Sequence, residues 1–492
     1  MDSITAGAAA PSRKPSLFIN RDYAFLWLGQ SISFMGDMMF ATTLVIWIAT
    51  GLGAHQSWAP LAVSGVLIAT AAPTLLVGVF AGVFVDRARK RPLMLWMDGL
   101  RALIVAALVA ASGVFPLPFI AGNRLPLVWA LGMLYGVVVL VNIGEQFFRP
   151  SAMALVQEIV PTELQARAMG FSQVSISLAL IIGPSLAAPL YAVFGPEWAI
   201  LIDAASYVVS FLTILAIREP RAVPIQAGQA AQHSEPAQRA GFWRELLAGA
   251  RFYFSNRVLV TLLIAIVVAM VGASALNTLD VFFATENLHA TTAMYGFLGG
   301  AMGIGSIVGS IVFGFLAQRI GLARTLWMTM AAFGVLVAYL SRVTDYNLAL
   351  GLFAVTGVLN AALNIAAGPM MMRETPNHLM GRVMSIFQPT MNLAILVGTA
   401  LVGYLDGVTL RGFHVVALGQ TFGAVDTIWL GGGVLMFLSG LVIMVGLTGV
   451  DRRYRAEDRA AAAAASAAAA SAAAASERND SAEAPVVAEM IH

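Results

Sequence analysis

Residues 160–172 read VPTELQARAMGFS, and residues 375–387 read TPNHLMGRVMSIF, the same pattern 215 positions later. Each copy is a short polar break between two long apolar runs. Aligned over 160–188 at that offset, the copies share 9 identities in 29 positions. The chain is therefore predicted to consist of two related halves that carry the same structural joint. The identities within the break are Pro161/Pro376, Leu164/Leu379, Arg167/Arg382 and Met169/Met384.

The runs around each break have the length of transmembrane helices. The chain is 59% hydrophobic and 11% charged, whereas soluble domains carry about 25% charged residues. Stretches of about twenty apolar residues cross a bilayer as helices, and lipid allows only helices or closed barrels. Without strand-like alternation, the sequence predicts an all-α membrane protein with twelve transmembrane helices in two pseudo-symmetric six-helix bundles. The expected spans are 23–50, 59–85, 93–113, 125–147, 166–190, 198–217, 257–283, 294–317, 322–341, 346–372, 380–405 and 425–449.

The distribution of Lys and Arg predicts the orientation. With the N-terminus inside, cytoplasmic loops and tails carry 24 of the 28 basic residues, outer loops carry 3, and Arg101 lies within a span. Because basic residues accumulate in cytoplasmic loops, we expect both termini in the cytoplasm and a multi-pass protein in the inner cell membrane. Topology explains the net charge of +2, so no nucleic-acid partner is expected.

A polar linker and a low-complexity tail complete the organisation. Apolar residues of GFWRELLAGARFYFSNR (241–257) share one helical face, which predicts a helix in the membrane interface or, alternatively, a partner-binding helix. The alanine-rich tail is either helical or disordered, and we find no chemistry in it. The expected divisions are an N-terminal tail at 1–20, bundles at 21–218 and 257–449, the linker at 219–256 and the tail at 450–492.

The chain resembles the major facilitator superfamily over nearly all of 20–449. Segments similar to the branch with macrolide and enterobactin exporters are LWLGQSISFMGD (26–37), FFRPSAMALVQEIVP (147–161), GPSLAAPL (183–190) and IDAASYVVS (202–210). The resemblance implies a transporter that binds its substrate between two halves, which rock to alternate access. The superfamily signature after the second span is matched at Gly82, Asp86, Arg87, Lys90 and Arg91, with Arg89 in place of its second glycine.

A second motif concerns the coupling of substrate export to protons. Gly183 and Pro184 resemble the fifth-span signature Gly-Pro-x-x-Gly-Gly of drug/proton exporters, with alanines for the two later glycines. The fourth-span arginine of many such exporters has no counterpart, because no basic residue lies between Leu127 and Phe148. The motif favours antiport, but coupling through a fourth-span arginine is not expected.

Charged residues near the cytoplasmic mouth are candidate gating residues. The resemblance suggests that Asp86 faces the start of the eleventh span near His378–Gly381, where free helix N–H groups stabilise a carboxylate. Such a contact would latch the halves together. Arg87, Lys90 and Arg91 either assist the latch or only follow the positive-inside pattern.

Charges within the third and fourth spans offer a second set of contacts. Arg101 and Glu145 both lie in the inner half of the membrane and are expected to pair across the first bundle, more as a structural ion pair than as a site. Glu145 also has Arg149 at i+4, which is the favourable order for a helical pair.

Aspartates within spans are the candidate proton-coupling or substrate-binding residues. Asp37 lies fourteen residues after Tyr23, about 21 Å along a helix, so it must face a cavity or a partner, or be protonated. The alternative is a structural break at Gly36. Asp203 and Asp280 are expected nearer the outer surface, where water solvates them. The amides Gln173, Gln388 and Asn392 either bind substrate or bridge helices.

These features predict a secondary active transporter, most simply a proton-coupled exporter of a small amphipathic compound such as a drug, macrolide or siderophore. The alternatives are a specific metabolite transporter of the same fold, and a non-transporting membrane sensor or scaffold. No nucleophile–base set, metal-ligand cluster or nucleotide loop is recognisable, so neither an enzyme nor a cofactor is expected. The expected partners are the substrate, protons and the lipid bilayer, and the protein is expected to be monomeric.

Overall fold

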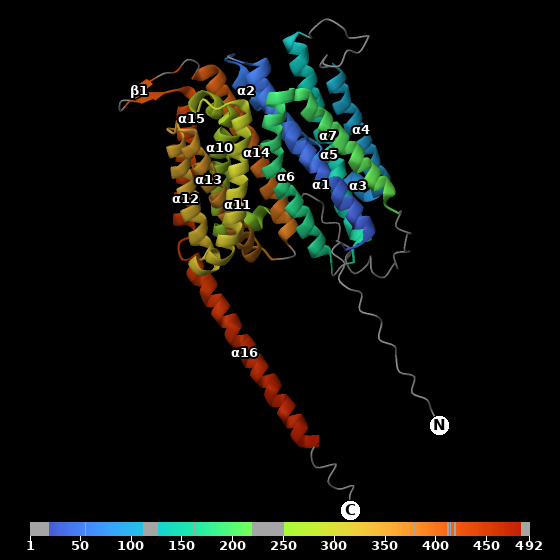
Figure 1. The fold of residues 1–492 in the computed structure, drawn as a ribbon. Helices are drawn as coiled ribbons and strands as arrows, with labels where there is room; N and C mark the ends of the chain where they lie inside the picture. The colour runs from blue at the N-terminus through green and yellow to red at the C-terminus, as the bar shows by residue number, and fades with distance from the viewer. Residues whose placement is uncertain are drawn as a thin grey trace, which may run out of the picture.

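The computed structural model describes residues 19–54, 56–111, 126–161, 164–218, 250–376, 379–410, 413, 415–417 and 420–483 of the chain. Nearly all of this part is helical (Figure 1). It contains twelve helices that are long and apolar enough to cross a membrane, six in each half of the chain. The predicted fold class and number of spans are therefore confirmed.

The first half begins with a capped helix. The Asn20 side chain accepts a hydrogen bond from Tyr23 N at 2.7 Å, which starts α1. The expected span 59–85 is divided at Val77, one turn after Pro73, because proline disturbs the helix around it. The helices are α1 (Arg21–Ile46), continued by the π-helix η1 (Trp47–Leu52), α2 (Ala59–Leu76), α3 (Gly78–Arg87), α4 (Lys90–Ala111), α5 (Leu127–Ile159), α6 (Gln165–Phe194) and α7 (Pro196–Ala216).

The second half repeats this plan. Its one departure from the expected all-α fold is a short antiparallel hairpin, in which Val415 pairs with Phe422. The elements are α10 (Arg257–Phe282), η3 (Phe283–Asn287), α11 (Thr292–Ile320), α12 (Leu322–Leu340), α13 (Tyr346–Glu374), α14 (Met380–Tyr404), η5 (Leu405–Thr409), β1 (Val415–Ala417), β2 (Gln420–Phe422), α15 (Ala424–Gly446) and α16 (Val450–Glu483). Most of the expected linker helix lies outside the described residues.

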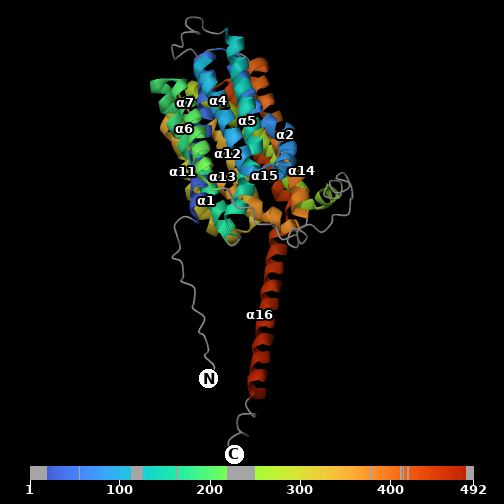
Figure 2. The ribbon, with the colours of Figure 1, turned by 90° about the vertical axis from the view of Figure 1, so that its right-hand side faces the viewer.

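The start of α1 and the whole of α16 lie at the same end of the helix bundle, which we call the terminal end (Figures 1 and 2). The hairpin β1–β2 lies at the opposite end, which we call the far end (Figure 1). Helices alternate in direction between these ends, so α6 runs toward the far end and α11 returns from it.

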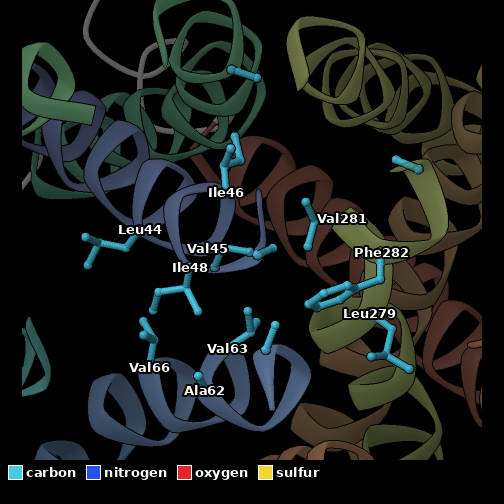
Figure 3. Packing of buried hydrophobic residues seen from close by; sticks show 14 of the residues in the cluster. Leu44, Val45, Ile46, Ile48, Ala62, Val63, Val66, Leu279, Val281 and Phe282 are labelled. Carbon is cyan, nitrogen blue, oxygen red and sulfur yellow. The ribbon is translucent and has the colours of Figure 1, made fainter. Parts of the chain in front are cut away.

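The two halves pack together toward the far end. Gly296 of α11 lies against α6, where an added Cβ would be 2.6 Å from Pro184 O. Gly403 of α14 approaches α2 in the same way, with its Cβ position 2.0 Å from Ser64 Oγ. Apolar residues of α1, η1 and α2 also lie beside Leu279, Val281 and Phe282 of α10 (Figure 3). The far end is therefore closed in this conformation.

The start of the alanine-rich tail is a docked helix, which resolves the choice between helix and disorder for this part of the chain. Asp451 accepts hydrogen bonds from Ala323 N at 2.9 Å and Arg324 N at 3.0 Å, so it caps the start of α12. Tyr454 donates to Glu374 Oε1 at 2.6 Å, and Arg453 pairs with the same carboxylate. Burial, together with Glu374, raises the pKa of the Tyr454 hydroxyl, so it remains a donor.

We predict that truncation after Gly449 destabilises the protein, whereas truncation after Arg459 does not. The first cut removes Asp451, Arg453 and Tyr454 and leaves the Glu374 side chain, which is only 7% exposed, with fewer partners. Hydrogen bonds to charged groups contribute about 1.5–3 kcal/mol each. Thermal unfolding in detergent measures the difference, and equal midpoints for the two truncations would show that the docking contacts are energetically unimportant.

Candidate functional site

A buried arginine organises the first half. Arg101 of α4 is 1% exposed, and its Nη1 and Nη2 atoms each lie 2.7 Å from a carboxylate oxygen, of Glu145 and Asp98 respectively. Its guanidinium carbon also lies 4.5 Å from the ring centre of Tyr207 and 4.7 Å from that of Phe148. Both rings face a cation, an arrangement that is strongest when desolvated. The expected pair between Arg101 and Glu145 is therefore present.

Asp98 is the member of this cluster that the sequence reading missed. Its side chain is fully buried and lies one turn before Arg101 on the same helix. The i, i+3 spacing of opposite charges inside an apolar span was the available signal. The additional pair expected between Glu145 and Arg149 is not formed among the described residues, because Glu145 turns to Arg101 instead.

Asp37 lies next to this cluster. The Tyr207 hydroxyl of α7 donates to Asp37 Oδ1 of α1, so the tyrosine contacts both the aspartate and the guanidinium of Arg101. No described residue donates to Asp37 Oδ2, and the side chain lines a cavity. The carboxyl group therefore faces open space on one side and the polar cluster on the other.

The placement of Asp203 near water is wrong. Its side chain is fully buried between α7 and α1, and no described residue donates a hydrogen bond to either oxygen. Small residues allow the two helices to approach this closely. An added Cβ at Gly36 would lie 2.8 Å from Asp203 Oδ1 and 2.4 Å from Ser206 Oγ.

Asp280 is also not simply solvated. It is half-buried in α10 and accepts a hydrogen bond from the Tyr295 hydroxyl of α11 at 2.8 Å. Each half of the chain thus contains an intramembrane aspartate bonded by a tyrosine. Asp280 does not line the cavity at Asp37, so the structure does not bring the two aspartates into one site.

The cavity at Asp37 has a volume of about 240 Å³ and lies within the first half, between α1, α2, α4, α5 and α6. Its charged lining includes Arg149, which is exposed and forms no ion pair with a described residue. The mixture of charged and apolar walls suits an amphipathic molecule. The charged lining residues are Asp37, Arg101, Glu145 and Arg149, and the larger apolar ones are Phe34, Met38, Phe40, Leu44, Ile176 and Leu180.

A second cavity, of about 490 Å³, lies at the terminal end between α11, α12, α13 and α16. Its charged lining includes Arg373, Asp451 and Asp458, which already hold α16 in place. We therefore assign this cavity to the docking of the tail rather than to substrate.

The motif residue Gly183 lies beside the site. A Cβ at Gly183 would be 2.5 Å from Met38 Cβ, so this glycine lets α6 pack against α1 next to Asp37.

The three candidate amide side chains do not lie at the cavity next to Asp37. Gln173 and Gln388 are exposed, Asn392 is half-buried, and none lines the cavity at Asp37.

The candidate gate is only partly described. The side chains of Asp86 and His378 lie outside the described residues, so the expected latch stays a prediction. Arg91 donates to the carbonyls of Ile214 at 3.2 Å and Leu215 at 2.8 Å, which caps the end of α7. Lys90 donates to Ala88 O at 3.0 Å, and Arg87 is exposed.

Comparison with known proteins identifies the family. The family described as "Transmembrane secretion effector" matches residues 13–418. Macrolide efflux protein A of Streptococcus pyogenes is 22% identical over 378 residues, which cover 76% of this chain and 87% of the relative. The putative bacilysin exporter BacE of Bacillus amyloliquefaciens is 24% identical over 407 residues, which cover 81% and 92%.

Solved structures show the same fold. A bacterial homologue of the iron transporter ferroportin, in its inward-facing state, superposes with a TM-score of 0.64 at 14% identity, covering 87% of this chain and 99% of that one. The family match spans most of the sequence, and the helices have the same architecture. The chain therefore belongs to the transmembrane secretion effector family of the major facilitator superfamily and is a multi-pass membrane transporter of the efflux branch, not an enzyme.

Proposed function

We propose that this transporter exports a small amphipathic compound in exchange for protons, with Asp37 as the residue that couples the two. The observation that carries the proposal is the position of Asp37. One carboxylate oxygen accepts the Tyr207 hydrogen bond, and the side chain lines the cavity in the first half. A carboxyl group so placed can be reached by both a proton and a substrate.

The neighbouring charges support coupling at this residue. Arg101 is held between Glu145 and Asp98 at 2.7 Å each, and it lies over the ring of the tyrosine that bonds Asp37. A proton that binds Asp37 removes a negative charge from this cluster, which lies in a low-dielectric environment where charge interactions are strong. The cluster links helices α1, α4, α5 and α7, so its charge state bears on how these helices pack.

The charge distribution and the closed far end support an assignment of the two sides of the membrane. Basic residues concentrate on the terminal side, which makes that side cytoplasmic in an inner membrane. The far end, where α6 packs on α11, then faces outward and is shut. In this conformation the monomer would take substrate from the cytoplasm, and separation of α6 from α11 would release it outside as the halves rock.

The cavity wall and the relatives support an amphipathic substrate. Apolar side chains such as Phe34 and Leu180 share the cavity with Asp37, Glu145 and Arg149. Relatives named for macrolide efflux and bacilysin export match most of the chain. Macrolides and other amphipathic drugs are the first compounds to test.

At the mouth, we propose that Asp86, with Arg87, Lys90 and Arg91, closes the terminal end when the far end opens. The support is the match to the superfamily signature and the position of Arg87 at the end of α3.

We predict that Asp37→Asn abolishes proton-driven accumulation. Inside-out vesicles carrying the wild type should accumulate a radiolabelled macrolide, or another compound found by a drug and siderophore panel, when the interior is made acidic. Asp37→Asn should accumulate no more than protonophore-treated vesicles, because the amide cannot exchange a proton. The matched control is Asp345→Asn, which replaces an exposed helix-capping aspartate at the far end and should behave as wild type. Wild-type accumulation by Asp37→Asn would rule out Asp37 as the coupling residue.

A further inference from the structure

Asp203 is a buried acid that the transport mechanism above leaves without a role. Both of its carboxyl oxygens are enclosed, so neither exposes surface to which water could bind, and no described residue donates a hydrogen bond to them. An isolated ionised carboxylate is very costly in such surroundings and neutralises instead. The ionised form of the Asp203 side chain is therefore strongly disfavoured in this conformation.

The charged groups around Asp203 do not offer it an ion pair. Arg101 of α4, the only cation near it among the described residues, is bonded to Asp98 and Glu145. Asp37 of α1 is an acid like itself, and Tyr207, one turn along α7, donates to Asp37. The titratable residues of α6 are Arg167 and Tyr191, near opposite ends of that helix. Each neighbour is thus engaged elsewhere or carries the wrong charge.

We propose that Asp203 is a second, sealed proton-binding site, and that it is loaded and unloaded through Asp37. The inference rests on the proposed function for the role of Asp37, but the proton on Asp203 does not depend on transport. The two carboxyl groups share no hydrogen bond in this conformation, so transfer requires them to approach each other as the helices repack. The proton then leaves the Asp203 carboxyl group and binds the Asp37 carboxylate, so the pair keeps one proton and one negative charge. The two acids are electrostatic neighbours, and a negative charge on one disfavours ionisation of the other.

The geometry points to Asp37 as the route. Asp203 lies against the backbone of Gly36, the residue before Asp37, because the missing Cβ lets Oδ1 approach. Asp37 is in turn the member of the pair that lines the cavity. Asp203 lines neither of the two cavities described above, so a proton fits this site and a hydrated cation does not.

Infrared difference spectroscopy of the purified, substrate-free transporter tests the site. A protonated carboxyl group without a hydrogen bond absorbs at higher wavenumber than a hydrogen-bonded one, and labelling with ¹³C-aspartate assigns the band. We expect the wild type to show this band near neutral pH and Asp203→Asn to lose it. Asp280→Asn is the matched control and should retain it, because Asp280 is bonded by Tyr295. Failure to observe the band in the wild type would overturn the proposal.

Thermal stability tests the protonation of Asp203 independently of the infrared band. Asparagine has the shape of a neutral aspartic acid, so Asp203→Asn should unfold at the wild-type temperature if Asp203 is protonated. An ionised Asp203 that helps to hold Arg101 would instead make the same variant markedly less stable. That outcome would contradict the proposal even where the spectrum is weak.

Transfer into D₂O tests the route. The Asp203 band should shift as deuterium replaces the proton in the wild type. In Asp37→Asn this shift should be lost over the time in which the wild type completes it, because the carrier at the cavity is gone. Equally fast exchange in both proteins would refute loading through Asp37. It would leave proton-driven transport to be judged separately by the vesicle measurement.

Discussion

Oxidation of a Ser185→Cys/Gly300→Cys variant should stop transport completely, and reduction should restore it. A Cβ at Gly300 of α11 would lie 3.7 Å from Ser185 Cβ of α6. Disulfides have a mean Cβ separation of about 3.8 Å, so this separation suits a bridge. The bridge joins the two halves at the far end, where alternating access requires them to separate.

The protein is suited to this experiment because its sequence contains no cysteine. Substrate transport in vesicles is measured before and after oxidation, and loss of thiol labelling shows how much bridge has formed. Each single-cysteine variant should transport in both conditions. Full transport by molecules shown to be cross-linked would mean that α6 and α11 stay together through the cycle, and that the closed far end is not a gate.

Replacing Arg101 with methionine should destabilise the fold more than any other single side-chain change proposed for this transporter. Methionine keeps much of the volume but leaves Asp98 and Glu145 without their cation, and Asp98 is fully buried. Removing one partner of a buried ion pair costs about 3–5 kcal/mol. We expect a large fall in the thermal unfolding midpoint in detergent and a low yield of folded protein.

A compensating variant shows whether the loss of charge or the loss of packing explains the lower stability of Arg101→Met. Arg101→Met combined with Asp98→Asn and Glu145→Gln should recover part of the lost stability, because the buried carboxylates are neutralised together. Residues in one network couple in this way rather than add. Arg452→Met, the same change at an exposed residue of α16, should be close to neutral. If the triple variant were no more stable than Arg101→Met, packing rather than charge would explain the loss.

The helical spans were predictable because they depend on local properties of the chain. Apolar length and composition decide whether a segment crosses a bilayer. Expected spans such as 257–283 and 322–341 agree with the helical spans Arg257–Asn287 and Leu322–Leu340. The division at Val77 was not expected, although Pro73 was visible in the sequence. A proline bends or breaks a helix according to what packs around it.

The candidate site was predictable only in part. Asp37 was singled out because an acid deep in an apolar span needs a partner or a cavity, and it has both. Asp203 was misplaced because depth along a helix was estimated, whereas burial depends on which face meets a neighbour. Asp98 was overlooked for the same reason, since its burial follows from the side of α4 that faces α5 and α7.

The sequence by itself determined the number of spans, the two related halves, the family and the presence of costly acids within the membrane. Each of these follows from local composition or from residue order, which do not change with packing. The pair of Arg101 and Glu145 was expected from the sequence, but only the tertiary structure decided that Tyr207 bonds Asp37 and that Asp98 also bonds Arg101. Helices far apart in sequence bring Tyr207 to Asp37 and Glu145 to Arg101, because close approach depends on small residues such as Gly36 on both packed faces. That packing leaves Asp203 enclosed and Asp37 open to the cavity, although both are aspartates in apolar spans.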